Sequence, residues 1–521
     1  MEKFIKGMGI FSVFGTCLLA LCSCSDSGDT IKDEYNTNLP SENVTINIGP
    51  DKTRIIHNPL NGWVLYLARN KNENFWEETG YDHMYVPDLG KEVKVSDYAG
   101  TCYLRTNWKT LEPEQGQYAW NDPSSDFYRL MKSVRDRGKK IALRVLVDGR
   151  DQQQNTPDYV FEAGAEYYGS PKSPYPDDKT FQSLYEKFIE ALAERYDNPD
   201  EVDFIDGYGL GKWGESHAMV YLDNSNKKTV MEWITGLYSR CFTKVPLVIN
   251  YHRMIGDTNQ SSWSETVPED AEELLNIAIN NGYILRHDAF GMTDYYKDWE
   301  KQFAARWNFK LPILMEGGWI TGGTHRYWID SSGKYREGHP EDVRKGEFEA
   351  SMEAHVNTMD FRYGTDTESW FSDAYSYVQQ FISEGGYRLY PDMISLPNKL
   401  TNTKDVVIVH RWNNLGWGYC PTNIRAWNQK YKVAFALMSE EDKIVKIFVD
   451  EQTDLSTWLK GNPTTYTLNL NLKGIPVGAY FWCVGLVDVT NDNCIGLNMS
   501  VPKDGNLLDS GWLKLSAFIV E

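Results

Sequence analysis

Cysteine is scarce in this sequence. Eight cysteines occur among 521 residues. Beyond residue 24 an odd and scattered set remains, which excludes a disulfide scaffold: Cys102, Cys241, Cys420, Cys483 and Cys494. The last two are close enough in sequence to face each other across a hairpin, and the sequence leaves that pairing open.

The short motifs of several protein classes are also absent. No CxxC or HExxH spacing occurs, so neither a structural zinc site nor a zincin centre is predicted. The sequence has no GxSxG motif. The run GYGLGKWG (207–214) lacks the downstream acidic partner that dinucleotide binding requires. We therefore expect no metal and no cofactor.

Positive charge is in short supply. The chain has 53 Lys and Arg against 73 Asp and Glu, a formal net charge of −20. Such a chain repels phosphate backbones, so we expect no nucleic-acid partner. Aromatic residues, in contrast, are abundant, with 18 Trp and 32 Tyr. Most of them fit a core, but flat aromatic faces also stack on sugar rings.

The N-terminus has the pattern of an export signal. Lys3 and Lys6 precede the apolar run 10–21, which is too short to span a bilayer as an anchor. Leu21 lies three residues before Cys24, which resembles the bacterial lipobox.

That resemblance implies a signal peptide over 1–23 and a lipid attached to Cys24, with a plain secretory signal as the alternative. The following SDSGD (25–29) resembles the acidic tag of surface lipoproteins in Bacteroidetes. We therefore expect an outer-membrane lipoprotein, exposed at the cell surface and held by its N-terminal acyl anchor.

Three regions are expected in the mature chain. Residues 24–50 are polar and predict a flexible tether. Residues 51–392 alternate apolar runs with amphipathic stretches, which indicates a (β/α)8 TIM barrel. Its expected strands are 62–68, 101–106, 141–147, 202–210, 246–250, 283–290, 311–317 and 355–361. In residues 393–521 helical periodicity disappears, and short strands between turns predict a smaller antiparallel β-sandwich domain.

Two glutamates follow expected barrel strands. Chemistry in such barrels takes place where the strands end. In LPILMEGG (311–318) five apolar or proline residues lead straight into Glu316. A buried charge at that position is costly unless it forms an ion pair or has a role in function. Glu215 follows the fourth strand in the glycine-rich GLGKWGESH (209–217). A structural ion pair of Glu316 with Arg105 or Arg144 is the alternative.

Strands four and seven face each other across a barrel mouth, so these carboxyls are expected to converge. Enzymes that cleave glycosidic bonds usually place two carboxyl groups beside one sugar. These groups are about 5–5.5 Å apart in retaining enzymes and about 6.5–9.5 Å apart in inverting ones. The predicted ligand is an oligo- or polysaccharide. Further polar or aromatic residues near strand ends are expected to bind it: Arg105, Asn107, Asp148, His217, Asn250, His252, Asp288, Tyr295 and Trp319.

The barrel resembles the clan A glycoside hydrolases. YLRTNWKTLEPEQGQYAWN (103–121) is similar to their second strand and its exit, and LPILMEGG is similar to their nucleophile segment. The resemblance implies a retaining reaction with Glu316 as nucleophile, Glu215 as acid/base and Arg105 supporting Glu316. Gly214 stands where the clan usually has Asn. The whole chain resembles surface lipoproteins of carbohydrate-utilisation loci in Bacteroidetes.

Other interpretations stay open. If Glu215 is a bystander, Asp148 and Asp288 are alternative acids. The missing Asn favours a second hypothesis, a non-catalytic glycan-binding lipoprotein that keeps the barrel as a binding surface. A structural or adhesive lipoprotein is a third.

Overall fold

The structure is a computed structural model that describes residues 43–150, 153–258, 264–292, 295–321, 333–400 and 405–521. The expected signal peptide, most of the expected tether and the lipid-bearing Cys24 lie outside the described residues. Within the described ranges, no helix is long and apolar enough to cross a membrane.

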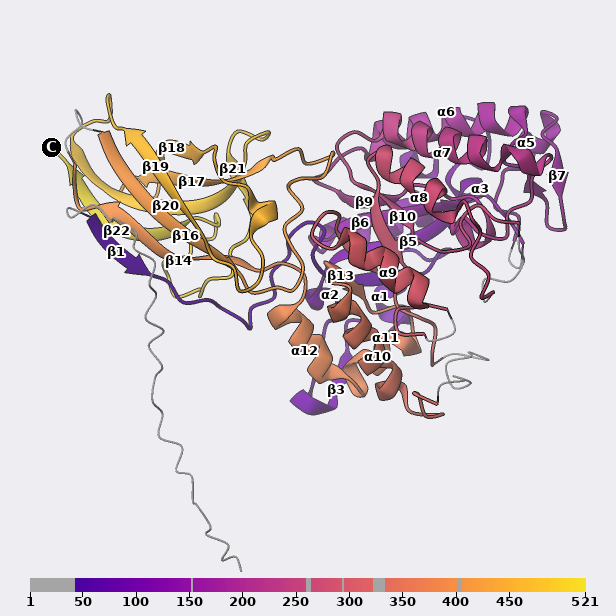
Figure 1. Cartoon of the computed structure of the whole chain (residues 1–521), viewed down its shortest axis with the longest axis horizontal. Helices are drawn as coiled ribbons and strands as arrows, with labels where there is room; N and C mark the ends of the chain where they lie inside the picture. The colour runs from indigo at the N-terminus through magenta and orange to yellow at the C-terminus, as the bar shows by residue number, and fades with distance from the viewer. Residues whose placement is uncertain (1–42, 151–152, 259–263, 293–294, 322–332, 401–404) are drawn as a thin grey trace, which may run out of the picture. The chain divides into compact units, whose positions relative to one another are not determined.

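Eight parallel strands close into a barrel, which confirms the predicted fold (Figure 1). The strands are β2 (Gly62–Leu67), β5 (Ala99–Asn107), β6 (Lys140–Leu146), β9 (Val202–Asp206), β10 (Leu247–Asn250), β11 (Ile284–His287), β12 (Ile313–Met315) and β13 (Thr358–Asp360). Each predicted strand overlaps one of them.

Helices connect these strands. They are α1 (Phe75–Glu78), α2 (Val95–Tyr98), α3 (Trp108–Leu111), α4 (Asp126–Asp136), α5 (Asp158–Glu162), α6 (Lys179–Tyr196), α7 (Lys227–Cys241), α8 (Ala271–Asn280), α9 (Asp298–Trp307), α10 (Pro340–Glu353), α11 (Thr365–Ser372) and α12 (Tyr375–Glu384). The loops of the barrel also contain two short two-stranded sheets. These are β3 (Met84–Val86) with β4 (Lys91–Val93) and β7 (Tyr167–Tyr168) with β8 (Ser173–Pro174).

Side chains alternate across the barrel wall because successive residues of a strand point to opposite faces. Outward residues such as Leu65, Leu143 and Ile313 pack in one cluster with helix residues. The inward residues of the middle of the barrel are also apolar: Tyr103, Ala142, Phe204, Val248, Ile284 and Leu314. Both faces of each strand are therefore covered, which explains the continuous apolar runs in the sequence.

The C-terminal part consists of two sheets that share one apolar core, as predicted for a β-sandwich. One sheet has the order β1 (Asn43–Asn47), β14 (Leu389–Pro397), β16 (Asp405–Asn414), β19 (Thr464–Asn471). The other has the order β15 (Lys399–Leu400), β22 (Leu513–Val520), β20 (Gly478–Asp488), β17 (Tyr431–Met438), β18 (Ile444–Asp450), with β21 (Cys494–Leu497) beside β20. All pairings are antiparallel except that of β15 with β22.

Two observed boundaries differ from the expected ones. Residues 43–47, expected in the tether, form strand β1 and pair with β14. Strand β1 is short, largely exposed and at a sheet edge, and three of its five residues, Asn43, Thr45 and Asn47, are polar, which is why it resembles the polar tether before it. Strand β14 begins at Leu389, inside the range expected for the barrel. A proline usually indicates the end of a strand, but Pro391 lies within β14 at a β-bulge.

Cys483 and Cys494 do not pair in the structure. Both are free, Cys483 is buried, and Cys494 lies opposite Asp488 on the neighbouring strand.

Candidate active site

A layer of polar side chains lies toward the C-terminal ends of the barrel strands. Two positions after each inward apolar residue named above comes a polar one, so these residues point into the barrel mouth. This polar layer consists of Arg105, Arg144, Asp206, Asn250, Arg286 and Glu316. All but Arg105 are buried. Charged groups buried at this depth must pair with one another.

Glu316 follows directly after β12 and is bound by arginines. Its Oε1 accepts hydrogen bonds from Arg105 Nη2 and Arg362 Nη1, and its Oε2 accepts one from Arg286 Nη1. A nitrogen of Arg144 lies 3.7 Å from Oε2. Burial alone would raise the pKa of Glu316, but these guanidinium groups hold that pKa well below its ordinary value. Glu316 is therefore a permanent carboxylate.

Glu215 lies in the loop after β9 and is equally buried. Its Oε1 accepts hydrogen bonds from Arg105 Nη2 at 2.7 Å and from Arg144 Nη1 at 3.0 Å. His217 Nε2 lies 3.4 Å from its Oε2. Burial opposes the charge, but Arg105, the hydrogen bond from His217 and Arg144 lower the pKa of Glu215 to about 2. This carboxyl is also ionised at neutral pH.

The loop that carries Glu215 is strained. Trp213, Ser216 and Ala218 have positive φ angles of 56°, 66° and 50°. For residues other than glycine such conformations cost on the order of 1–3 kcal/mol each, and they cluster at functional sites. Gly214 has a φ of 71°, and a Cβ there would lie 2.6 Å from Leu146 Cδ2 and 3.1 Å from Arg144 Cδ. A side chain at this position therefore meets both a close contact with Leu146 and a positive φ.

A Gly214→Ala substitution is expected to destabilise the protein by about 1–3 kcal/mol, because it adds both steric overlap and an unfavourable φ. Thermal or urea denaturation measures the effect. The matched control is Gly236→Ala in α7, where nothing lies within 4 Å of the new Cβ. This control is expected to stabilise the protein by roughly 0.5–1 kcal/mol. Equal effects of both substitutions on stability would show that the positive φ and the close contacts at Gly214 do not require a glycine there.

Arg105 brings the two glutamates together. Its Nη2 donates to Oε1 of both Glu215 and Glu316. Two hydrogen bonds that share one nitrogen place their acceptor oxygens no more than about 6 Å apart. Charges balance around this contact. The four arginines that surround it face four carboxylates: Arg105, Arg144, Arg286 and Arg362 against Asp206, Glu215, Glu316 and Asp360.

Three histidine rings stack beside Glu215. The His217 and His252 centroids are 5.3 Å apart, and the His252 and His287 centroids are 5.7 Å apart. We call His217, His252 and His287 the histidine column. Tyr295 packs against the column, 4.9 Å from His252. Asn250 donates to Asp288 Oδ1 at 3.2 Å next to the column. Five expected sugar-binding residues thus gather on the side of the mouth formed by β9, β10 and β11.

Three other expected ligand residues do not join this group. Asn107 is the N-cap of α3, and its Oδ1 accepts from Thr110 N at 2.6 Å. Asp148 holds the loop after β6 together through Arg150, Tyr168 and Ser173. Trp319 lies on the opposite side, with the Arg362 guanidinium 4.6 Å from its ring and Tyr66 beside it.

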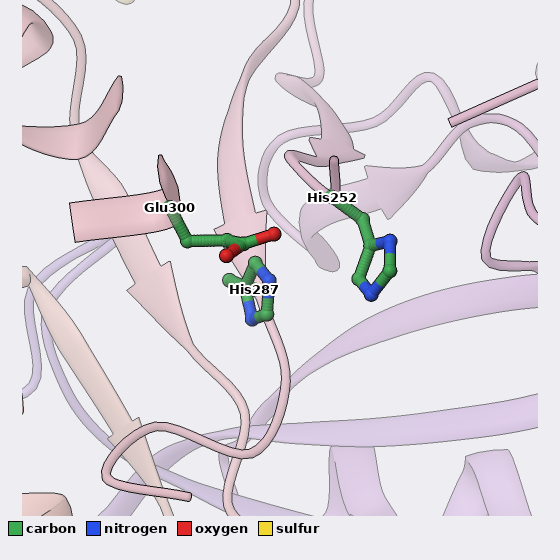
Figure 2. Close-up of side chains that lie close together, drawn as sticks. All are labelled: His252, His287 and Glu300. Carbon is green, nitrogen blue, oxygen red and sulfur yellow. The ribbon is translucent and has the colours of Figure 1, made fainter. Parts of the chain in front are cut away.

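His252, His287 and Glu300 converge as metal ligands would, with ligand atoms within 4.8 Å of one another (Figure 2). Their hydrogen bonds do not fit a cation. His252 Nδ1 accepts from Met254 N at 3.0 Å, so the neutral ring carries its proton on Nε2. Glu300 already binds Arg253 Nη1 at 2.9 Å, which neutralises its charge. We infer no metal site there.

Sequence reasoning missed much of the charge network. Arg286, Arg362, Asp206 and Asp360 were not expected at the site, although they bind the two glutamates or their arginines. For residues within the strands a signal was available in the sequence. Asp206 lies two positions after the inward residue Phe204 on the same strand, so its side chain is also expected to point into the barrel.

No protein-family model matches this sequence, and no curated protein matches it. Several solved structures resemble its fold. The catalytic domain of a β-amylase from Paenibacillus polymyxa shares 10% identity and covers 62% of this chain and 98% of its own, with a TM-score of 0.41. Xylanase 10B from Thermotoga maritima shares 12% identity over 58% of this chain and 83% of its own, with a TM-score of 0.36.

An exo-β-1,4-mannosidase from Opitutaceae bacterium strain TAV5 shares 15% identity over 66% of this chain and 62% of its own, with a TM-score of 0.37. At such values these likenesses carry no argument about activity. The fold assignment rests on the strand pairing of the closed barrel itself.

Proposed function

We propose that this protein is a retaining glycoside hydrolase that acts on an oligo- or polysaccharide, with Glu316 as the nucleophile. The observation that carries the proposal is the single Arg105 nitrogen that binds both Glu316 and Glu215 at the barrel mouth. Their nearest oxygens are therefore at most about 6 Å apart, and Glu316, a buried carboxylate that its arginines keep ionised, is the kind of group that forms the covalent intermediate of a retaining reaction.

The histidine column supports a sugar as the ligand. Within the described part of the chain, His217 Nδ1, His252 Nε2 and His287 Nε2 are buried without a hydrogen-bond partner. His252 offers a proton, because its Nδ1 accepts from a backbone amide. His287 offers a lone pair, because its Nδ1 donates to the Asp288 carbonyl. Sugar hydroxyls both donate and accept, so they satisfy such a mixed set.

Trp319 supplies an aromatic face for the same ligand. It is half-buried at the mouth and follows Glu316 by three residues. The Arg362 guanidinium and Tyr66 hold its ring in place. An aromatic ring of this kind can stack on the apolar C–H groups of a sugar.

We place the enzyme at the cell surface as an outer-membrane lipoprotein. This part of the proposal comes from the lipobox-like sequence that ends in Cys24 and the acidic residues after it. Incorporation of labelled palmitate into the wild-type protein but not into a Cys24→Ala variant tests it.

A non-catalytic glycan-binding protein is the second candidate. One observation favours it: Arg105 and Arg144 keep Glu215 ionised, with a pKa of about 2. A resting enzyme needs a protonated acid to give a leaving group its proton. Glu215 in this state has no proton to give.

A hydrolysis screen combined with binding calorimetry separates the two candidates. The probes are aryl β- and α-glycosides of common hexoses and pentoses, followed by plant and host polysaccharides. Cleavage with retention of anomeric configuration, followed by proton NMR, is the expected result. Tight binding of a glycan without any product favours the binding protein, and inversion rules out the proposed reaction.

A further inference from the structure

Proton delivery is the step that the Glu215–Glu316 pair leaves unexplained. Among the described residues, five carboxyl groups line the barrel mouth: Asp206, Glu215, Asp288, Glu316 and Asp360. Four of them have an arginine nitrogen within ion-pair distance. Asp288 forms no ion pair with an arginine or lysine of the described residues, and the sequence alone left it as one alternative acid among two.

The backbone places Asp288 beside Glu316. In the register of β11 and β12, His287 pairs with Met315, and Glu316 N continues the ladder by donating to His287 O at 2.8 Å. The next residues on the two strands, Asp288 and Glu316, therefore lie side by side. Both come two positions after an inward residue, so both side chains point into the mouth. Neighbouring strands are about 4.8 Å apart, which is close to the carboxyl spacing of a retaining pair.

The neighbours of Asp288 suit a neutral acid. Asn250 Nδ2 donates to its Oδ1 at 3.2 Å. His287 Nδ1 lies 3.7 Å from the same oxygen. That nitrogen donates to the backbone carbonyl of Asp288, and burial lowers the pKa of His287 to about 4, so the ring brings no positive charge. The side chain of Asp288 is 12% exposed, whereas Glu215 and Glu316 are almost completely enclosed.

We propose that Asp288, and not Glu215, is the general acid and base of this site; this inference rests on the proposed hydrolase function. In the first step the Asp288 hydroxyl gives its proton to the glycosidic oxygen while the bond from that oxygen to the anomeric carbon breaks. Glu316 Oε forms an ester bond to the same carbon. In the second step the Asp288 carboxylate takes a proton from water, the hydroxide attacks the anomeric carbon, and the ester bond to Glu316 breaks.

Electrostatics agree with this role. Burial, together with the charges of Glu215 and Glu316, raises the pKa of Asp288 to about 7, although Arg105 and Arg362 act in the opposite direction. Among the residues that the structure describes, Tyr295 also interacts electrostatically with Asp288, and it is neutral because burial raises its own pKa well above the ordinary value. Near pH 7 Asp288 is therefore partly protonated, as a general acid must be.

Leaving-group dependence tests the proposal. The wild-type enzyme, Asp288→Asn and Glu215→Gln are compared on the phenyl and 2,4-dinitrophenyl glycosides of a sugar that the wild type cleaves. A phenyl group needs a proton to leave, and a dinitrophenyl group does not. In Asp288→Asn we expect kcat/KM for the phenyl glycoside to fall by about 10²–10⁴-fold. The dinitrophenyl glycoside is expected to react within about tenfold of wild type in the glycosylation step.

Two further readouts separate a catalytic from a structural role. The basic limb of the wild-type pH profile, near pH 7, is expected to disappear in Asp288→Asn, and azide is expected to restore turnover of the dinitrophenyl glycoside as a glycosyl azide. If Glu215→Gln shows this selective loss and azide rescue while Asp288→Asn slows both substrates equally, the inference is wrong but the hydrolase proposal stands. If the wild type cleaves nothing in the screen, both proposals fail.

Discussion

Glu316→Gln is expected to abolish glycoside hydrolysis, with kcat lowered by on the order of 10³-fold or more. The amide nitrogen and oxygen of Gln form no stable ester with the sugar, so the covalent step is lost. Steady-state kinetics on the best aryl glycoside of the screen measures the change. Unchanged turnover by a folded Glu316→Gln protein would rule out the mechanism.

Folding requires its own control here, because the substitution also removes a charge from a balanced network. Without Glu316, four arginines face three carboxylates, and an unpaired buried charge costs about 3–5 kcal/mol. Glu316→Asp keeps the charge but withdraws the carboxylate by one methylene. We expect this variant to fold like the wild type and to lose about 10²-fold in kcat, since small displacements of a reacting group have effects of that size.

Asp206→Asn is expected to destabilise the protein by about 3–5 kcal/mol. Asp206 Oδ2 accepts hydrogen bonds from Arg144 Nε at 2.7 Å, Tyr103 Oη at 3.0 Å and Arg286 Nη1 at 3.2 Å. An amide in its place leaves two buried guanidinium groups short of negative charge. Urea denaturation at pH 7, with the midpoint and slope compared with wild type, measures the loss.

Asp203→Asn is the matched control for this prediction. It lies on the same strand and is also buried, but its carboxylate accepts from Thr101 Oγ1 and Leu60 N and contacts no arginine of the described residues. Loss of neutral hydrogen bonds is expected to cost only about 1–2 kcal/mol. Equal destabilisation by both substitutions would show that the arginines do not depend on Asp206.

The barrel was predictable because its strands are covered on both faces. Runs such as IALRVLV (141–147) are apolar at nearly every position. Such a run can be recognised in the sequence as a buried strand without knowing which other strands lie beside it. Strand β1 was not predictable, since an exposed edge strand needs few apolar residues. Its identity depends on β14, which lies more than 300 residues later in the chain.

The site was predictable only in part. Glu316 stood out because a charge ended a buried strand. Arg286 and Arg362 did not stand out, because a single arginine beside an apolar run resembles the end of any strand. Their significance comes from Glu316, which both contact across the barrel mouth. Gly214 looked like a departure from a family pattern, and the close approach of Leu146 gives its physical reason.

In the proposed reaction, the ion pairs of Glu316 with Arg105, Arg286 and Arg362 make the two steps change the acidity of Asp288 in turn. Once Glu316 is esterified to the sugar, one negative charge disappears from the mouth while all the guanidinium groups remain. One of the two charges that, together with burial, had raised the pKa of Asp288 is then missing, so this pKa falls and the group gives up its proton more readily. Asp288 thus becomes a base when a water molecule has to be activated, and hydrolysis of the ester restores it as an acid.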